Sequence, residues 1–115
     1  MLTPGLHGFH VHQNPDCSFG EKGGKKISGL ATGGHYDPLG AGRHTGPYGN
    51  GHLGDLPALY VDGIAQASHP ALAPRLKLSD LKGRSLMIHA GGDNYSGNPK
   101  TPGGGGARMA YGVVE

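Results

Sequence analysis

The stretch Gly5-Leu-His-Gly-Phe-His-Val-His12 decides how the rest of this sequence is interpreted. Its second half alternates apolar residues with histidines, and this period of two predicts a β-strand over residues 6–12. Side chains two positions apart share a strand face, so His10 and His12 would present both imidazoles on one side. Such a pair suits copper or zinc, although two half-exposed strand histidines are the alternative. His7 has the opposite parity, so we expect it to face elsewhere and make a structural hydrogen bond.

Glycine is the most unusual feature of the composition, at 24 of 115 residues, with 9 prolines beside it. This content leaves few uninterrupted windows for helices, and the glycines do not follow the Gly-X-Y repeat of collagen. Charged residues make up only 16% of the chain and the net charge is +2, which argues against a disordered chain. The composition therefore predicts one folded domain over residues 1–115, all-β and rich in loops.

The other predicted elements are short strands between long loops. Strands are expected over residues 58–66, 73–78, 84–90 and 108–114, and loops over residues 13–29, 31–57 and 91–107. Residues 79–83 predict a turn or a single helical turn capped by Ser79. A loop as long as 31–57 is uncommon in a compact domain unless something holds it in place, and a bound metal would do so.

That long loop contains a second set of metal-ligand residue types, namely His35, His44, His52 and Asp55. Three imidazoles and one carboxylate make a closed tetrahedral set that suits zinc. Metal-binding energy would then substitute for a hydrophobic core in this segment. The alternative is a loop whose polar residues have no common partner. A hydrolytic zinc site is disfavoured, because it needs an open coordination position.

Three further residues are candidates for supporting roles. His89 ends the predicted strand 84–90, and Asp93 follows it as either a turn residue or a carboxylate that orients ligand imidazoles. Arg108 follows the run of four glycines at 103–106, where it could guide a small anion or begin the last strand. His69 lies in a predicted loop and is interpreted as a surface residue.

Composition also limits the expected partners and location. A pI near 8.8 is too mild to indicate nucleic acid, and no apolar run reaches transmembrane length. We therefore expect neither a nucleic acid nor a membrane as a partner. The first five residues lack the basic and apolar regions of a signal peptide, which predicts a cytoplasmic chain if this start is genuine. The single cysteine, Cys17, cannot form an internal disulfide.

Several of these segments together resemble the Cu/Zn superoxide dismutase family. They are Gly5 to His12, Gly33-Gly-His-Tyr-Asp-Pro38, Gly51-His-Leu-Gly-Asp55, and Gly103-Gly-Gly-Gly-Ala-Arg108 followed by Gly112-Val. The segment His-Ala-Gly-Gly-Asp-Asn-Tyr at 89–95 is similar to the bacterial, periplasmic branch. The resemblance covers nearly the whole chain and implies a Greek-key β-barrel or sandwich with long metal-binding loops.

The resemblance also implies a role for each candidate residue. Copper would be bound by His10, His12, His35 and His89, and zinc by His35, His44, His52 and Asp55, with His35 bridging the two metals. Asp93 would link ligands of the two metals. In the implied conversion of superoxide to oxygen and hydrogen peroxide, Arg108 would hold the anion and His35 would carry a proton.

Two departures from the family pattern bear on activity. The family has strands before the copper-ligand strand, and we expect this chain to lack roughly the first three, which leaves an open sheet edge for a homodimer or another association to cover. The family disulfide would join Cys17 to position 111, which is Tyr111 here; losing such a bond commonly costs about 2–5 kcal/mol. An active dismutase, a weakly active or inactive metal-binding protein and a fragment that needs a partner all remain open. The resemblance implies a periplasmic location.

Overall fold

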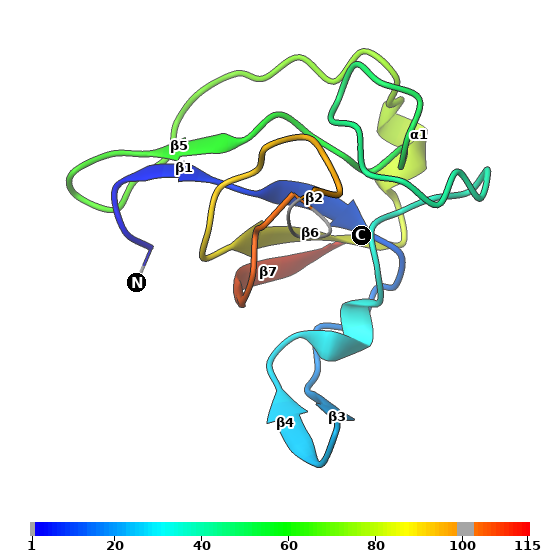
Figure 1. The fold of residues 1–115 in the computed structure, drawn as a ribbon, viewed down its shortest axis with the longest axis vertical. Coiled ribbons are helices and arrows are strands. Elements are labelled where there is room, and N and C mark those ends of the chain that lie inside the picture. Colours follow the sequence, from blue (N-terminus) through cyan, green and yellow to red (C-terminus); the bar gives the residue numbers. More distant parts are fainter. Residues whose placement is uncertain (1, 99–102) are drawn as a thin grey trace.

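Short strands make up most of the regular structure of this chain (Figure 1). The structure is a computed structural model that describes residues 2–98 and 103–115. The strands are β1 (Gly5–His7), β2 (Phe9–His12), β3 (Gly20–Lys22), β4 (Lys25–Ile27), β5 (Leu59–Val61), β6 (Arg84–His89) and β7 (Arg108–Val114). A 3-10 helix, η1 (Leu30–Thr32), and a short helix, α1 (Leu78–Leu81), complete the described elements. The all-β prediction is confirmed.

An antiparallel sheet in the order β2-β6-β7 forms the centre of the fold, while β1 pairs with β5. The predicted strand over 6–12 is therefore two strands, with the break at Gly8. The Gly8 N–H donates to the Gly91 carbonyl at 2.8 Å, and a side chain at position 8 would come within 3.2 Å of the Gly92 carbonyl oxygen. Glycine thus allows the 91–92 loop to approach the point where the chain changes partners.

The pairing of β2 with β6 separates two faces of the central sheet. His10 lies opposite Met87 and His12 opposite Ser85, so these four side chains share one face. All four are at most 1% exposed. Val11, which is fully buried, points to the other face. The interior on the first side is therefore built largely from histidines rather than from aliphatic side chains.

A β-bulge changes the sheet face to which the first residues of β7 point. Met87 pairs with Tyr111, but the register shifts between Ile88 and His89, so that His89 pairs with Arg108. Met87 and His89 share a face because they are two residues apart, and their partners Tyr111 and Arg108 therefore share that face as well. Without the bulge, the odd spacing from 108 to 111 would send these two side chains to opposite faces.

The predicted boundaries were confirmed for some elements and wrong for others. Strand β7 matches the prediction of 108–114, and β6 ends one residue earlier than the predicted 84–90. The predicted loop 13–29 contains the β3–β4 hairpin, which extends away from the central sheet in Figure 1. The predicted strand 58–66 is cut to Leu59–Val61 because the Asp62 carboxylate accepts the backbone N–H groups of residues 64 and 66 and closes a turn.

The predicted strand over 73–78 was wrong. Pro74 has no N–H to give to a ladder, and a turn from Ala73 to Leu76 leads into α1. The N-cap of that helix is Lys77 rather than the predicted Ser79, because the Asp80 carboxylate accepts the Lys77 N–H at 2.8 Å. Within the described residues, no helix is sufficiently long and apolar to cross a membrane.

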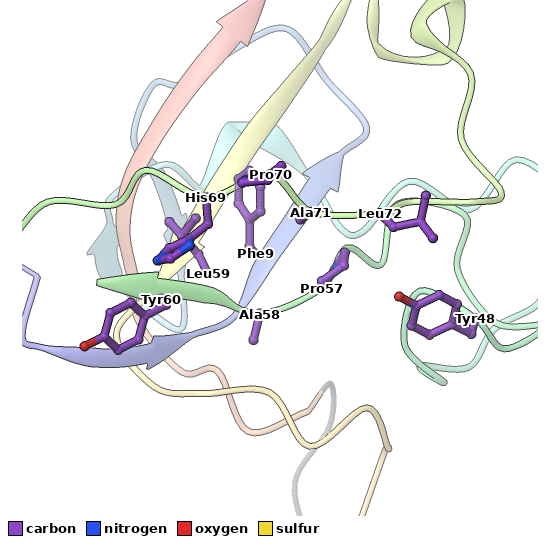
Figure 2. Close-up of a pocket in the computed structure, with 10 residues that line it drawn as sticks. All are labelled: Phe9, Tyr48, Pro57, Ala58, Leu59, Tyr60, His69, Pro70, Ala71 and Leu72. Atoms are coloured by element: carbon purple, nitrogen blue, oxygen red, sulfur yellow. The ribbon is translucent and has the colours of Figure 1, made fainter. Parts of the chain in front are cut away.

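A hollow of about 430 Å³ lies beside β5 and is bordered by the extended segment 69–72 (Figure 2). Phe9 and Leu59 line it from the strands, and His69 and Pro70 line it from the opposite segment. Its lining is largely apolar, and it shares none of the candidate metal ligands. Residues 99–102 of the predicted loop 91–107 lie outside the described residues.

Candidate metal centre

The long segment 34–56 lies against β2 and carries its histidines to the buried face. The Tyr36 N–H donates to the Val11 carbonyl at 2.7 Å, and the Val11 N–H donates to the Gly54 carbonyl at 2.8 Å. A Cβ atom at Gly54 would lie 2.4 Å from the Val11 carbonyl oxygen, so this approach requires glycine. Bridges of the β type then place His35 beside His12 and Asp55 beside His10.

The first cluster contains His10, His12, His35 and His89. One ring nitrogen from each lies within 4.8 Å of the others, and all four side chains are buried. Strand β2 supplies two of them, the end of β6 supplies His89, and the docked loop supplies His35. The prediction that His10 and His12 point to one face is confirmed by the strand register and by their membership of the same cluster.

The second cluster surrounds the carboxylate of Asp55. The Nδ1 atoms of His35 and His44 each lie 2.8 Å from one of its oxygens, and His52 Nδ1 lies 3.3 Å from Asp55 Oδ2. The set of four residues whose ligand atoms lie within 4.8 Å of one another has His10 in place of His52. The ring of His52 is also the most exposed of the cluster, at 17%. His52 is therefore near the second cluster but held less closely.

Unpaired buried atoms in these clusters mark where an ion would fit. Among the described residues, the buried side-chain atoms without a hydrogen bond include His10 Nδ1, His12 Nε2, His44 Nδ1, His52 Nδ1, Asp55 Oδ2 and His89 Nε2. Buried polar atoms are normally paired, because an unpaired one costs free energy. His44 Nδ1 and His52 Nδ1 face Asp55 Oδ2 at 2.8 and 3.3 Å, without a well-aligned hydrogen bond. The ligand atoms gather in two adjoining groups that share His10 and His35, which is the arrangement that bound cations would satisfy.

The opposite ring nitrogens are held by hydrogen bonds that fix the imidazole orientations. His12 Nδ1 donates to the Gly33 carbonyl at 2.8 Å and His89 Nδ1 donates to the Gly106 carbonyl at 3.0 Å. Each bond commits one nitrogen as a donor and leaves the other bare toward the cluster.

Asp93 joins the two clusters from outside. Its carboxylate accepts His10 Nε2 at 2.7 Å and His44 Nε2 at 2.6 Å, and it is only 1% exposed. The Tyr95 N–H adds a third bond at 2.8 Å. A Cβ atom at Gly103 would lie 2.2 Å from Asp93 Oδ1 and 2.7 Å from His44 Nε2. The sequence therefore needs a glycine at 103 to leave room for the Asp93–His44 contact.

Burial keeps most of the cluster histidines neutral. Desolvation lowers the pKa of His10 to about 4 and that of His12 to about 3, and it lowers the pKa of His35 and His89 as well. A ligand imidazole must be unprotonated to bind a cation, so these four rings are in the form that a metal requires near neutral pH.

His44 behaves differently because it lies between two carboxylates. Burial opposes its charged form, but the hydrogen bonds and charges of Asp55 and Asp93 outweigh this effect and raise its pKa to about 9. The pKa of each carboxyl is held below its usual range, because its histidine partners outweigh the opposing effect of burial. In the metal-free chain, the positive charge of protonated His44 therefore balances part of the negative charge of Asp55 and Asp93, as a bound cation would.

Arg108 faces the first cluster across a cavity of about 470 Å³, whose lining also includes His12, His35, His52 and His89. Residues 28–33, which we call the arginine turn, hold its guanidinium. Arg108 Nη1 donates to the Gly29 carbonyl at 2.8 Å and to Thr32 Oγ1 at 2.7 Å, and Nη2 donates to the Gly33 carbonyl at 3.0 Å. Desolvation lowers the pKa of Arg108, but an arginine stays charged at any working pH.

Sequence reasoning missed several residues that support the centre. Arg75 donates to the Gly51 and His52 carbonyls at 3.0 and 3.4 Å and so steadies the loop around His52. Thr32, which is fully buried, accepts from Arg108. No local pattern marks these contacts, because each joins segments far apart in the sequence. His7 was predicted correctly: its ring nitrogens contact the carbonyl oxygens of His89 and Thr3.

Fold and site together define a class: a small all-β protein with two adjoining His/Asp clusters of metal-binding type. A family model described as copper/zinc superoxide dismutase matches residues 1–114. The superoxide dismutase [Cu-Zn] of Pasteurella multocida is 60% identical over 116 residues, which cover 99% of this chain and 62% of that protein. The chain therefore belongs to the Cu/Zn superoxide dismutase family, as the sequence motifs predicted.

Solved structures confirm the fold class. The Cu/Zn superoxide dismutase from Brucella abortus superposes with a TM-score of 0.97 at 57% identity, over 100% of this chain and 75% of that one. A solution structure described as the monomeric copper, zinc superoxide dismutase from Salmonella enterica gives a TM-score of 0.84 at 51% identity, with the same coverage. The chain spans 62–66% of the length of the first curated relatives that it matches.

Proposed function

We propose that this chain binds copper and zinc and converts superoxide to oxygen and hydrogen peroxide. The observation that carries the proposal is the presence of two adjoining groups of buried His and Asp side chains, in each of which the ligand atoms lie within 4.8 Å of one another. Bound copper would supply one-electron oxidation and reduction of superoxide, and bound zinc would supply charge and order without redox chemistry.

We assign copper to His10, His12, His35 and His89, and zinc to His35, His44, His52 and Asp55. The assignment follows the placement of the ligand atoms. Nε2 of His12 and His89 and Nδ1 of His10 have no hydrogen bond on one side. On the other side, Nδ1 of His44 and of His52 face Asp55 Oδ2. His35 serves both positions, because its Nδ1 contacts Asp55 while its ring also belongs to the first cluster. Asp93 orients one ligand of each metal.

Arg108 and His35 are the residues to which we assign catalytic roles. A guanidinium carries more N–H donors than its three contacts with the arginine turn use. The remaining donors and the positive charge can hold a small anion in the cavity beside His35. With Nδ1 on the Asp55 side, His35 has Nε2 to hold a proton and release it to the reduced product.

A weakly active or inactive metal-binding protein is the competing function. The presence of Arg108 in the same cavity as His12, His35 and His89 favours an enzyme, because metal storage needs no anion site. The substitution of Tyr111 for the expected cysteine favours the competing function, since a covalent link is lost.

The deciding experiment measures superoxide dismutation by the purified chain after copper and zinc loading, with metal content determined on the same sample. We expect about one copper and one zinc per chain, with activity that is lost in His89→Ala. The matched control is His69→Ala, because His69 is exposed and lies outside both clusters. Full metal occupancy without activity would establish the metal-binding alternative, and failure to hold either metal would overturn both.

We also propose that a second copy of the chain is the partner of the open side of the sheet. Strand β7 is at the edge of the order β2-β6-β7, and its Met109 and Val113 are 44% and 41% exposed. An antiparallel copy could pair with this edge and cover a hollow lined by Phe9, Leu86 and Ile88. Size-exclusion chromatography with light scattering tests this, and a chain that is monomeric at high protein concentration would exclude it. The solved Salmonella enterica protein is itself described as monomeric.

A periplasmic location is proposed from the bacterial relatives and the 89–95 segment. Cell fractionation of the protein expressed from its native gene tests it. Recovery with cytoplasmic markers alone would contradict the proposal.

A further inference from the structure

Tyr111 occupies the position at which the family resemblance implies a cysteine, and its hydroxyl makes a side-chain contact. It forms a short hydrogen bond with Ser28 Oγ at the start of the arginine turn. Tyr111 is half-buried on β7, opposite Met87, which is fully buried. Through the bulge described above, it points to the same face of the sheet as Arg108.

The ring of Tyr111 also lies directly against the arginine turn. A Cβ atom placed on Gly29 would be 3.0 Å from Tyr111 Cε1 and 3.3 Å from Met87 Cε. Gly29 has a φ of 66°, the left-handed conformation that favours glycine. The backbone of residue 29 therefore sits on the aromatic ring with no side chain between them, and the ring limits how far the turn can move inward.

The same turn provides the acceptors that hold Arg108. The Gly29 carbonyl accepts from Arg108 Nη1 at 2.8 Å and from Thr32 Oγ1 at 2.8 Å. The Gly33 carbonyl accepts from Arg108 Nη2 at 3.0 Å and from His12 Nδ1 at 2.8 Å. A displacement of the turn would thus move the guanidinium and disturb an imidazole that we assign to copper.

The two ends of the turn are held by different parts of the chain. At the far end, the Ala31 N–H donates to the Ser18 carbonyl at 3.2 Å and the Asn14 N–H donates to the Thr32 carbonyl at 3.0 Å. Asn14 and Ser18 belong to an exposed segment. At the near end, Ser28 is hydrogen-bonded to the Tyr111 hydroxyl and Gly29 lies against the Tyr111 ring. Tyr111 belongs to the central sheet.

We propose that Tyr111 is a positioning residue: its hydroxyl on Ser28 and its ring on Gly29 fix the arginine turn, and so fix the Arg108 guanidinium beside the histidine cluster. The proposal rests on the anion-holding function proposed above for Arg108. It assigns to a noncovalent contact the task of tying this turn to β7. Tyr111 and Arg108 belong to the same strand, β7. The arginine turn and the guanidinium that it holds are therefore both anchored to β7.

The first test follows the guanidinium itself by nuclear magnetic resonance on the chain of residues 1–115 loaded with zinc alone, which is diamagnetic. The N–H signals of Arg108 are assigned by their loss in Arg108→Gln. We expect Tyr111→Phe, which keeps the ring, to increase the hydrogen-exchange rate of these signals about fivefold, the equivalent of one net hydrogen bond. Arg75, which donates to the Gly51 and His52 carbonyls, is the control within the same spectrum and should not change.

The second test separates positioning from a general loss of order. Azide, a small monovalent anion, is titrated into the copper- and zinc-loaded chain and followed by the visible absorption of copper. We expect Tyr111→Phe to raise the azide Kd about fivefold in the parent chain and to have no effect in the Arg108→Gln background. Tyr60→Phe is the matched control, because Tyr60 is an exposed tyrosine of β5 whose pairing does not involve the turn.

Unchanged Arg108 signals in Tyr111→Phe would overturn the proposal. So would an equal change in azide Kd in both arginine backgrounds, because Tyr111 would then act on the copper ligands rather than through Arg108. Ser28→Ala removes the same hydrogen bond from the other side and serves if Tyr111→Phe does not fold. A zinc-loaded chain with ordered Arg108 signals but no dismutation after copper loading would refute the proposed function while leaving the positioning role standing.

Discussion

Replacing Asp93 with asparagine should weaken the binding of both metals at once. The Asp93 carboxylate accepts one hydrogen bond from His10 and one from His44, which we assign to different metals. Asparagine has the same shape but only one acceptor oxygen, so one imidazole must face an amide N–H or rotate. Rotation turns the Nδ1 atom of that imidazole away from its cluster, where a ligand atom is needed.

The size of the effect follows from the number and burial of the bonds. The two bonds are 2.7 and 2.6 Å long, and the carboxylate is 1% exposed. Losing a carboxylate that orients a ligand imidazole commonly costs about 10- to 100-fold in metal affinity. This corresponds to about 1.4–2.8 kcal/mol for each metal. His89→Gln, in contrast, should weaken copper alone, because His89 belongs only to the first cluster.

Competition titrations with a chromophoric chelator measure the two affinities separately. Asp62→Asn is the matched control: Asp62 is a half-buried turn aspartate that accepts two backbone N–H groups and belongs to neither cluster. The reasoning fails if Asp93→Asn leaves both affinities within threefold of the parent chain, or if it weakens only one of them.

Three further outcomes are expected. Gly103→Ala should lower zinc affinity at least tenfold in the same titration, because its Cβ would fall 2.2 Å from Asp93 Oδ1; an unchanged affinity would show that the 103 backbone can move aside. Removing the metals with a chelator should lower the melting temperature by at least about 10 °C in calorimetry, and a change of under about 3 °C would show that the loops fold without them. In the metal-free chain, stability should fall as the pH drops from 6.5 toward 4, since the folded-state pKa values of His10 and His12 are about 4 and about 3 against an ordinary 6.5. His44, with its pKa raised to about 9, adds stability that is present below 6.5 and lost as the pH rises through 9; denaturant titrations at pH 5, 6.5 and 9 check for this maximum, and a flat profile would refute it.

Residue types and spacing alone predicted two sets, His10 with His12, and His35, His44 and His52 with Asp55. The roles of His89, Asp93 and Arg108 came from the family resemblance. The period of two across β2 was enough to place His10 and His12 on one face. The approach of His35 and Asp55 to that face was not predictable from periodicity, because it depends on backbone bonds between the 34–56 segment and Val11. The family resemblance supplied that grouping, and the structure gives its physical basis.

The errors came from segments where local propensity competes with proline or with side-chain bonds to the backbone. The 73–78 segment has an apolar residue at every second position near its end, but Pro74 and the Asp80 cap turn it into a bend and a short helix. The β3–β4 hairpin was missed because its strands are polar and short. The bulge at Ile88 and His89 has no signal in the sequence, yet it determines where Arg108 points.

The contact between Ser28 and Tyr111 has a consequence for the environments in which this protein can work. A disulfide has a reduction potential, and glutathione or thioredoxin can open it. A bond between two hydroxyl groups has no such potential, and Cys17 has no second cysteine to pair with inside residues 1–115. The position of the Arg108 guanidinium should therefore be the same in a reducing and in an oxidising compartment. Thiol reductants around the protein should not change the contacts of Arg108 with the arginine turn.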